Sequence, residues 1–431
     1  MFSPDDPAGP AFRAAIGARL GDFLDDACAR LDAISPALAP LGELALAFTA
    51  GGKRLRPAFC YWGHAAVAGQ PDDPAPLLDA AASFDLLHVA ALVHDDVIDA
   101  SDTRRGQASA HRQLEARHVD RSGAGDPAAF GRAGAILLGD LLTAWSDELV
   151  GRSGLPPAVL ARAHTVLDEV RTEVNAGQFL DMAAEAGLAG GDDPVAVAER
   201  VVEFKTARYT VIRPLQYGAA LAGADPATLE GLARLGSPLG RAFQLRDDLL
   251  GVFGDEARTG KPAGDDLREG KRTVLVAEAL AVEPRILDFL GRPLSAPELE
   301  RARALLVDCG PRPRRGAHRR RRRARPSGPV PARRHHRGAH RAGRPHRGLP
   351  RPRVLSPSPG PRIGLTSDPG APAEHGSFPG PPPAGPPPDD ELLFNETASA
   401  GVSFDLAHLD ALHWLTGLHG LPSPTVFGAT P

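Results

Sequence analysis

Three aspartates and two arginines lie close together in the stretch HDDVIDASDTRRG, residues 94–106. The spacing of Asp95, Asp96 and Asp99 places the first and the last of them on one helical face, one turn apart. Carboxylates at this spacing repel each other unless a cation lies between them, and hard oxygen ligands favour Mg²⁺. Arg104 and Arg105 follow, and arginine binds phosphate oxygens through paired hydrogen bonds. The stretch therefore predicts a site where Mg²⁺ and basic side chains hold a diphosphate.

A second acidic pair, Asp247 and Asp248, lies in the segment FQLRDDLLGVFGD. Gly251 stands four residues after Asp247, where an acid would repeat the first motif, and Asp255 lies farther along. Both acidic pairs follow an apolar run, so we expect each at the end of a buried helix rather than on a solvated helix face. Two such pairs backed by basic residues indicate one site assembled from distant parts of the chain.

Two further segments supply positive charge. GGKRLRP, residues 51–57, combines glycines, which allow close backbone approach to a ligand, with the side chains of Lys53, Arg54 and Arg56. TGKPAGDDLREGKRT places two lysines, Lys261 and Lys271, shortly after the second acidic pair. Lysine binds phosphate as a point charge, so both segments are candidates for holding phosphate groups.

Isolated polar side chains lie in helical segments between these motifs. GQFLD places Gln178 and Asp181 on adjacent positions of one helical face, and EFKTARYT pairs Lys205 with Thr206. His88 precedes the first acidic pair by two helical turns on the same face. A lone histidine on an apolar helix is usually a core residue, but this register favours a role as a ligand.

The elements that must position these residues are helices. From about residue 11 to residue 309, apolar residues recur at three- and four-residue spacing, and Gly and Pro separate the runs. Several runs begin with Asp or Ser followed by Pro, which is typical of a helix start. Strands of alternating Val and Ile are absent from the sequence pattern. We therefore predict roughly ten helices in one all-α domain over residues 11–309, with a flexible segment at residues 1–10.

The C-terminal region, residues 310–431, has a different composition. From residue 312 onward it carries 18 Arg, no Lys and eight acidic residues, against 31 basic and 45 acidic residues in the rest of the chain. Such an Arg-, Pro- and Gly-rich sequence cannot bury a core, so we expect it to be disordered. Two interpretations stay open, a frame-shifted translation of a GC-rich gene and an Arg-rich nucleic-acid arm.

Composition excludes several other classes. The acidic, Pro-containing N-terminus is not a signal peptide, and no run of 18 or more apolar residues predicts a membrane span. The three cysteines are far apart and lack metal-binding spacing, which indicates reduced, incidental thiols. We therefore expect a cytoplasmic protein.

Taken in order, GGKRLRP, HDDVIDASDTRRG, GQFLD, the Lys-Thr pair and FQLRDDLLGVFGD with its lysine-containing continuation resemble the motifs of trans-polyprenyl diphosphate synthases. The resemblance covers about residues 15–309, and the chain is similar to bacterial enzymes of the geranylgeranyl type. It implies an isoprenoid-synthase fold, a single all-α helical bundle around a central cavity, and a homodimer. It also implies a prenyltransferase that condenses an allylic diphosphate with isopentenyl diphosphate, using three Mg²⁺ ions.

The resemblance also implies a role for each motif residue. The metal ligands are Asp95, Asp96 and Asp99 for two ions and Asp247 with Asp248 for the third. The allylic diphosphate is held by Arg104, Lys205 and Lys261, with Thr206, Gln244 and Lys271 nearby. Isopentenyl diphosphate is held by Lys53, Arg56, His88 and Arg105. The residues nearest the chemistry are Asp95, Asp96, Asp99, Asp247, Lys205 and Gln178, with Asp181 facing the reacting carbons or the metal ions.

Small residues one turn before the first acidic motif bear on product length. Ala90 and Ala91 occupy the positions where a large aromatic side chain would close the cavity below the metal site. Two alanines leave that space open, and Phe84 and Leu87, deeper on the same helix, are candidates for the next floor. We therefore expect a product of C20 or longer.

Other functions are alternatives to this expectation. A non-catalytic partner subunit, or a homologue impaired by its tail, is one alternative, although the full set of acids and arginines in the first motif argues against it. A terpene cyclase would need no second diphosphate site, and a nucleic-acid binder rests on the arginine-rich tail alone. Two departures from the family are the glycine at position 251 and the apparent loss of the C-terminal helices after residue 309.

Overall fold

The computed structural model describes residues 1–190, 193–254 and 264–309. These residues form an all-α arrangement, as predicted. The N-terminal elements are α1 (Pro10–Ile34), the short helix η1 (Pro36–Leu38), α2 (Ala39–Thr49), α3 (Leu55–Ala68), α4 (Ala75–Ile98), strands β1 (Thr103–Arg104) and β2 (Gln107–Ala108), and α5 (Ala110–Asp120). The central elements are α6 (Pro127–Arg152), α7 (Pro157–Glu185), α8 (Pro194–Val201), the π-helix η2 (Val202–Ile212), α9 (Arg213–Leu221) and α10 (Pro226–Phe253). The C-terminal elements are α12 (Asp265–Glu269), α13 (Val274–Leu280), the short helix η3 (Pro284–Phe289) and α14 (Ala296–Cys309).

Aspartate followed by proline marks three of the helix starts, as the sequence predicted. The side chains of Asp126, Asp193 and Asp225 accept hydrogen bonds from backbone N–H groups in the first turns of α6, α8 and α10. Proline follows each aspartate, where its missing N–H costs nothing and its fixed φ favours helix entry. Local sequence therefore determines where these three helices begin.

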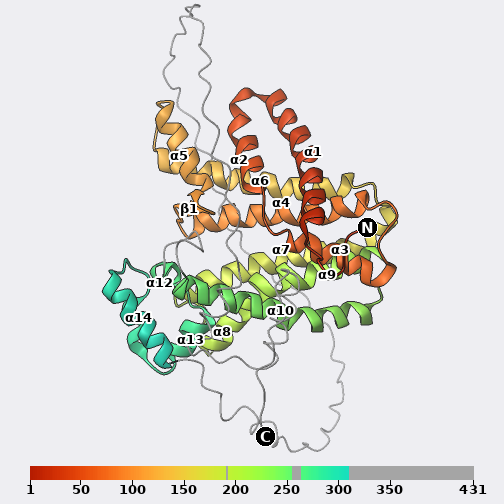
Figure 1. The fold of residues 1–431 in the computed structure, drawn as a ribbon. Coiled ribbons are helices and arrows are strands. Elements are labelled where there is room, and N and C mark those ends of the chain that lie inside the picture. The colour runs from red at the N-terminus through yellow and green to blue at the C-terminus, as the bar shows by residue number, and fades with distance from the viewer. Residues whose placement is uncertain (191–192, 255–263, 310–431) are drawn as a thin grey trace, which may run out of the picture. The chain divides into compact units, whose positions relative to one another are not determined.

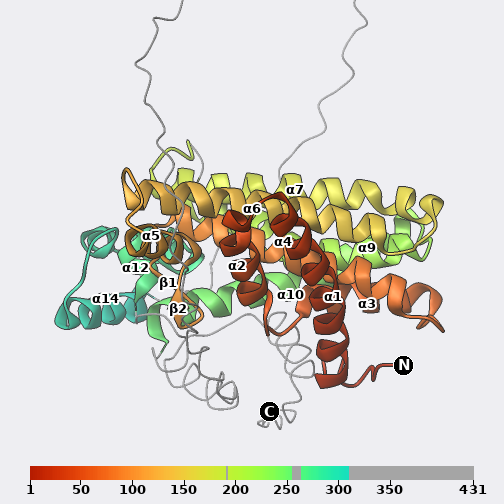
Figure 2. The same ribbon diagram turned by 90° about the horizontal axis from the view of Figure 1, so that it is seen from above.

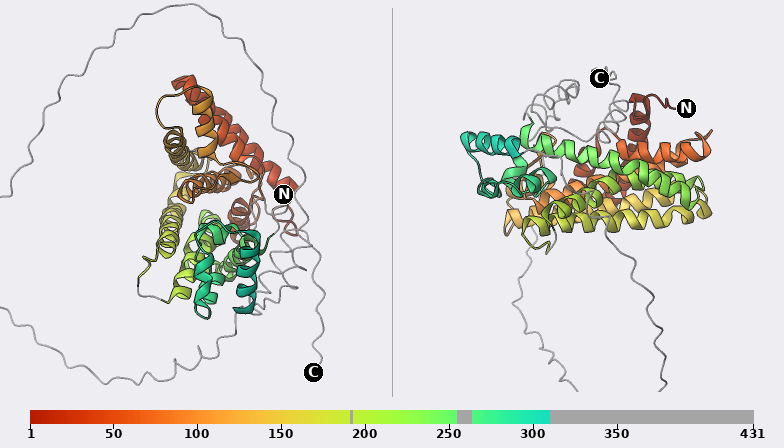
Figure 3. Two further views of the ribbon diagram at one scale, coloured as in Figure 1. Left: turned by 90° about the vertical axis from the view of Figure 1, so that its left-hand side faces the viewer. Right: turned by 90° about the horizontal axis from the view of Figure 1, so that it is seen from below.

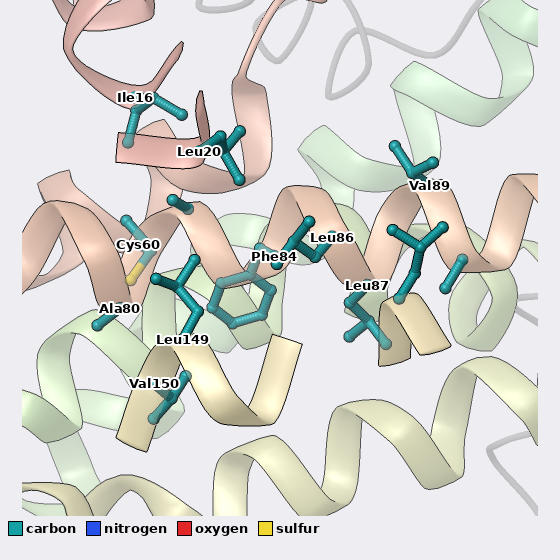
Figure 4. Packing of buried hydrophobic residues seen from close by; sticks show 14 of the residues in the cluster. Ile16, Leu20, Cys60, Ala80, Phe84, Leu86, Leu87, Val89, Leu149 and Val150 are labelled. Carbon is teal, nitrogen blue, oxygen red and sulfur yellow. The ribbon is translucent and has the colours of Figure 1, made fainter. Parts of the chain in front are cut away.

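Helix α4 is the centre of the larger core. It packs against α1, α3 and α6, and the long helices α4, α6, α7 and α10 run across the molecule in Figures 1 and 2. Figure 3, left, looks along these helices. Figure 4 shows Phe84 and Leu87 of α4 on the side that faces Leu149 and Val150 of α6, with Ile16 of α1 on the opposite side. Burial on several sides makes α4 apolar around most of its circumference.

The apolar character of α4 also gives it the length and hydropathy of a membrane-spanning helix. It is the one helix of this kind in the described ranges, and 78% of its apolar window is buried inside the protein. That burial is the pattern of a core helix.

A smaller core joins the C-terminal elements. Val252 at the end of α10 packs with Leu267, Val276, Ile286 and Leu306 from α12, α13, η3 and α14. This cluster holds the segment after the second acidic pair, which contains Lys271. The Arg-, Pro- and Gly-rich tail expected to be disordered, residues 310–431, lies outside the described residues.

Residues 1–10, predicted to be a flexible segment, make specific contacts with the helical domain. The ring of Phe2 packs edge-on against Phe12 and Tyr61 at 5.2 Å in each case, and its N–H donates to Gln70 Oε1 at 2.8 Å. Helix α1 already begins at Pro10. The aromatic side chain of Phe2 was the sequence signal for these contacts, and the acidic, Pro-containing composition drew attention away from it.

Helices α3 and α9 cross closely because a glycine lies at their contact. A Cβ at Gly218 of α9 would lie 1.8 Å from the carbonyl oxygen of Cys60 in α3. The backbones approach so closely that no larger residue fits without moving a helix. This crossing places α3, which follows the basic loop, next to the segment that follows η2.

We expect Gly218→Ala to lower the free energy of unfolding by about 1–3 kcal/mol, because the added methyl group overpacks the crossing. Chemical denaturation with guanidinium chloride measures the effect. Gly21→Ala in α1 is the matched control, since nothing lies within 4 Å of a Cβ there; it should be neutral or stabilising by up to about 1 kcal/mol. Equal effects of the two substitutions would contradict the close crossing.

Candidate functional site

The first acidic motif lies at the C-terminal end of α4. Asp95 and Asp96 belong to its last turn, and Asp99 follows the helix, with its N–H donating to the Asp95 carbonyl at 2.8 Å. Asp96 is fully buried, and its carboxylate accepts from Arg104 Nε at 2.8 Å. Arg104 Nη2 also lies 3.5 Å from Asp95 Oδ2. The predicted ligand Asp96 therefore pairs with an arginine in this structure, and the same arginine lies beside Asp95.

A two-stranded hairpin positions the two arginines that follow. Thr103 pairs with Ala108 and Arg104 with Gln107, which leaves a two-residue turn at Arg105 and Gly106. Both turn residues have positive φ, 53° and 76°, as a tight hairpin of this kind requires. The turn directs Arg104 to the acidic motif and brings Arg105 Nη1 to 3.4 Å from the carbonyl oxygen of Phe48 at the end of α2. This hairpin is the exception to the expected absence of strands, and two-residue strands are too short to show alternation.

Lys205 lies between two carboxylates. Its Nζ is 2.7 Å from Asp181 Oδ2 of α7 and 3.4 Å from Asp95 Oδ1, which also accepts from Gln178 Nε2 at 3.0 Å. Burial opposes the charge on Lys205, but Asp95 and Asp181 outweigh burial and raise its pKa. Burial likewise opposes ionisation of Asp95, and Lys205 with Lys271 nevertheless lowers its pKa. Both groups are therefore charged at neutral pH.

The neighbouring residue, Thr206, connects to the second acidic pair. Thr206 Oγ1 donates to Gln244 Oε1 at 2.5 Å, and Gln244 Nε2 donates to Asp248 Oδ1 at 2.7 Å. Consecutive residues of η2 thus contact the two acidic motifs, Lys205 the first and Thr206 the second. This geometry explains why a lysine and a threonine are neighbours in the sequence.

Two glycines allow η2 to lie close to its neighbours. A Cβ at Gly177 of α7 would lie 2.4 Å from the backbone nitrogen of Lys205, and a Cβ at Gly240 of α10 would lie 2.5 Å from the Cα of Ala207. Gln178 and Asp181 follow the first glycine, and Gln244 and Asp248 follow the second by one and two turns. Close packing at the glycines therefore brings both polar sets to η2.

The second acidic pair divides into a buried and an exposed member. Asp248 is 4% exposed, and burial raises its pKa well above the usual value. The side chain of Asp247 reaches solvent but is surrounded by protein, and this desolvation raises its pKa to about 6 against the opposing charges of Arg246 and Lys53. Asp255 and Lys261, two further predicted members of the site, lie outside the described residues.

The missing acid at Gly251 has a spatial replacement. The carboxylate of Asp266, from α12, lies where a side chain at Gly251 would be, 1.9 Å from the position of its Cβ. Lys271 Nζ lies 3.9 Å from Asp266, 3.3 Å from Asp99 Oδ2 and 2.5 Å from Glu269. Lys271 thus connects the first acidic motif to the segment after the second one.

A separate cluster of basic and aromatic side chains lies along α3, α4 and η2. Arg56 Nη2 donates to Thr210 Oγ1 at 2.7 Å, and its guanidinium carbon lies 4.3 Å from the centre of the Tyr209 ring. The Tyr209 hydroxyl lies 3.3 Å from His88 Nδ1. Burial, with Arg56 and Arg105, lowers the pKa of His88 well below its usual value, so the imidazole is neutral. Two of the four residues predicted for isopentenyl diphosphate, Arg56 and His88, belong to this cluster. The charge of Arg105 acts on His88, and that of Lys53 acts on Asp247.

The residues predicted to set product length lie in the core of α4. Ala90 is 1% exposed and Ala91 is half-buried. Phe84 is fully buried, with its ring 5.5 Å from that of Tyr217, and Leu87 is 6% exposed. Ala91, which packs against the edge of the core, is therefore the more exposed of the two alanines.

Sequence reasoning missed several residues of the site. Tyr209 lies one turn after Lys205 on the same helix, which was a usable signal, and Asp266 lies in the segment already singled out for its lysines. Asp85 and Glu185 gave a weaker signal, a single acid in a mainly apolar or neutral run. Arg54 was taken as a source of charge for a ligand, but its side chain points inward and pairs with Asp85.

The carboxylates can hold a metal only together with other ligands. Within the described ranges, no three acidic, His or Cys side chains converge closely enough to form a complete metal site. Asp248 Oδ2 is buried and has no hydrogen-bond partner in the part of the chain that the structure describes. Mg²⁺ usually takes one or two carboxylates and completes its shell with water and phosphate oxygens. The residues present fit a metal of this kind.

Comparison with known proteins agrees with this geometry. Residues 41–301 match the family described as polyprenyl synthetase. The geranylfarnesyl diphosphate synthase of Aeropyrum pernix is 35% identical over 266 residues, 61% of this chain and 77% of that protein. Heptaprenyl diphosphate synthase component 2 of Geobacillus stearothermophilus is 35% identical over 267 residues, 61% of this chain and 75% of that protein. A crystal structure of geranylgeranyl pyrophosphate synthase from Corynebacterium glutamicum, with isoprenyl diphosphate and magnesium, is 40% identical with a TM-score of 0.64, and the match covers 69% of this chain and 86% of that one.

Glu185 makes the stability of the protein depend on pH. Burial, with the charges of Asp181 and Asp99, raises the pKa of Glu185 to about 7. Between its usual value of 4.5 and about 7 the folded protein keeps a proton that the unfolded chain releases, so this group's contribution to stability is present at low pH and is lost as pH rises. We expect Glu185→Gln to become more stable relative to the parent protein between pH 5 and pH 8, by on the order of 1 kcal/mol.

Denaturant titrations of the metal-free protein at several pH values measure this difference. Glu230→Gln, at an exposed position of α10, is the control for the substitution itself. A stability difference for Glu185→Gln that stays constant from pH 5 to pH 8 would contradict the shifted pKa.

Proposed function

Because the chain belongs to the polyprenyl synthetase family and is therefore a prenyltransferase, we propose that it joins isopentenyl diphosphate to an allylic diphosphate and forms a product of C20 or longer. The relatives described above are named for geranylfarnesyl, heptaprenyl and geranylgeranyl products, which supports the proposed length. The observation that carries the proposal is a pair of neighbouring sites with opposite charge.

The acidic site is proposed to bind the allylic diphosphate through a divalent metal, Mg²⁺. We assign two ions to Asp95, Asp96 and Asp99 and a third to Asp247 with Asp248. The contacts support Asp248 most directly, because its buried Oδ2 has no hydrogen-bond partner among the described residues, whereas Asp95, Asp96 and Asp99 each lie beside a basic side chain. When bound, the metal neutralises the leaving diphosphate and so lowers the barrier to ionisation. Phosphate oxygens complete its coordination, which agrees with the incomplete protein ligand set.

The basic side chains have a complementary role in the proposed mechanism. Lys205, Arg104 and Lys271, with Lys261 and Gln244, hold the allylic diphosphate and stabilise negative charge as its C–O bond breaks. Lys205 and Lys271 already lie among the carboxylates. A lysine that pairs with a carboxylate in the absence of substrate can turn to a phosphate oxygen when one arrives.

The basic cluster is proposed to hold isopentenyl diphosphate through Lys53, Arg56, His88 and Arg105. The alkene of isopentenyl diphosphate attacks the allylic carbon, and a carbon–carbon bond forms. The released diphosphate accepts the proton that is lost. Gln178 and Asp181 are proposed to face the reacting carbons or the metal, and their contacts with Asp95 and Lys205 support this role. Charged groups fixed in advance act most strongly where water is excluded.

We propose a homodimer that works in the cytoplasm. Phe130, Ile136 and Leu137 of α6 and Phe179 of α7 are large apolar side chains between 46% and 69% exposed. Exposed apolar side chains gathered on two helices are typical of an interface. The relative named component 2 favours a second possibility, a partner chain of a different kind. Size-exclusion chromatography of the purified protein separates the two, since a homodimer forms without any added partner.

We propose residues 11–309 as the catalytic domain. The family match over residues 41–301 supports this boundary. Residues 310–431 are proposed to take no part in the chemistry, either as frame-shifted sequence or as an appended arm.

Incubation with isopentenyl diphosphate, each of several allylic diphosphates and Mg²⁺ tests the proposed function by product chromatography. We expect elongated products of C20 or longer, loss of activity with EDTA, and recovery when Mg²⁺ is restored. Asp95→Ala and Asp248→Ala should each lower kcat by at least about 100-fold, because each removes charge that holds the metal. Asp32→Ala, at an exposed position of α1, is the control. Elongation that persists in EDTA would contradict the metal assignment, and no product with any primer would refute the function.

Ala91→Phe tests the assignment of product length. Ala91 is half-buried, so a phenyl ring there disturbs the core less than one at Ala90 and shortens the path of the growing chain; we expect C15 to replace longer products. Ala90 is fully packed, and Ala90→Phe should lower stability as well. Ala14→Phe, at an exposed position of α1, is the matched control. An unchanged distribution for Ala91→Phe would remove this helix face as the determinant.

A further inference from the structure

The loop that carries Lys53 and Arg56 has an unusual backbone. Gly51, Gly52 and Arg54 all have positive φ, at 71°, 93° and 52°. Glycine adopts this region at little cost, but an arginine does so at an energetic cost that its surroundings must offset. Something must therefore hold Arg54 in place, and its position directly before α3 fixes where Arg56 enters that helix.

The side chain of Arg54 is fixed at both ends of its guanidinium group. Nη1 donates to Asp85 Oδ2 at 2.7 Å, and Nη2 donates to the carbonyl oxygen of Thr49 at 2.8 Å. The Arg54 and Asp85 side chains are each 8% exposed. Thr49 ends α2, where a helix leaves carbonyl groups without partners and carries partial negative charge. Arg54 thus links the loop to α2 and α4 at once.

Asp85 is surrounded by positive charge. Burial raises the pKa of Asp85, and the charges of Arg54, Arg56 and Arg105 oppose that rise. Asp85 lies one turn before His88 on α4, and Arg105 also approaches the end of α2, at the Phe48 carbonyl. Two of these arginines are proposed to hold a diphosphate, whereas both terminal nitrogens of Arg54 donate to groups inside the protein.

We propose that Asp85 and Arg54 form a positioning pair, which holds the basic loop so that Lys53, Arg56 and Arg105 are set for isopentenyl diphosphate. Arg54 itself does not contact the substrate. One buried carboxylate among three arginines keeps them close together and leaves net positive charge for an anion. This inference rests on the proposed function, because it assigns a determinant of affinity for one of its two substrates.

The sign of the effect separates positioning from simple electrostatics. If Asp85 acted only as a negative charge near the substrate, its removal would strengthen diphosphate binding. If Asp85 positions the loop, its removal weakens binding even though an unfavourable charge is gone. A residue needed only for folding would change stability and leave both substrate constants alone.

The test measures KM for each substrate, kcat, and the direct Kd for isopentenyl diphosphate by calorimetry, for the full chain. We expect Asp85→Asn and Arg54→Met to raise KM and Kd for isopentenyl diphosphate by about tenfold or more, with less than about threefold change in the allylic KM. Arg54→Lys should not restore affinity, since lysine keeps the charge but loses the two-pronged geometry.

Two further variants keep the test decisive. Arg54→Met combined with Asp85→Asn removes both charges and so avoids an unpaired buried ion; it should fold and show the same loss of affinity. Asp79→Asn is the matched control, because Asp79 is a buried aspartate of the same helix whose carboxylate accepts from Arg19 Nε at 2.5 Å. It should lower stability without changing either KM.

The outcomes distinguish this inference from the proposed function. A parent protein that binds and turns over isopentenyl diphosphate, with Arg54 and Asp85 variants that behave like Asp79→Asn, overturns the positioning pair alone. Tighter binding in Asp85→Asn also overturns it, in favour of simple electrostatics. A parent protein that binds no isopentenyl diphosphate overturns both.

Discussion

Repulsion between carboxylates is the constraint around which this protein is organised. Asp95, Asp96 and Asp99 end one helix, and Asp181, Asp248 and Asp266 reach the same region from three other elements. Burial would penalise such a cluster by several kcal/mol for each unpaired charge. Lys205, Lys271 and Arg104 lie among the acids and offset that penalty. The same arrangement allows a ligand to replace these ion pairs. A ligand that brings both cations and phosphate oxygens offers the carboxylates and the basic side chains new partners at the same time.

The backbone delivers these side chains through close helix packing. Helix η2 lies against α7 and α10 where two glycines remove the side chains that would separate them. This proximity lets consecutive residues of η2 reach both acidic motifs, Lys205 the first directly and Thr206 the second through Gln244. A π-helix fits this task, since such helices are rare and occur mostly at functional sites. Packing at the glycines and hydrogen bonding at the site are therefore parts of one arrangement.

The sequence predicted much of this, for identifiable physical reasons. Helical periodicity and Asp-Pro starts are local, so the all-α fold and the starts of α6, α8 and α10 were predictable. The motif residues were predictable as a set because their chemistry is specific. The partners of those residues were less accessible. Arg54 looks like Arg56 in sequence, and only the positive φ and the long-range contact with Asp85 show that it points inward. Asp266 takes the place of the acid missing at position 251 through a contact across a loop that spacing along one helix cannot reveal.

Helix α4 explains how a basic site and an acidic site can coexist so closely. Groups of opposite charge on mobile segments would collapse into ion pairs with each other and leave no charge for a ligand. His88 and Asp95 are seven residues apart on one helix, which separates them by about 10 Å at the helical rise. Asp85 pairs with Arg54 of the basic loop and His88 contacts Tyr209 of η2, whereas Asp95 contacts Lys205 and Asp99 contacts Lys271. Because the helix is buried over most of its length, this separation is fixed before any substrate binds. The packing that makes α4 so apolar thus also keeps the acidic site and the basic cluster at a constant distance, and an elongation reaction needs such a distance to be the same in every cycle.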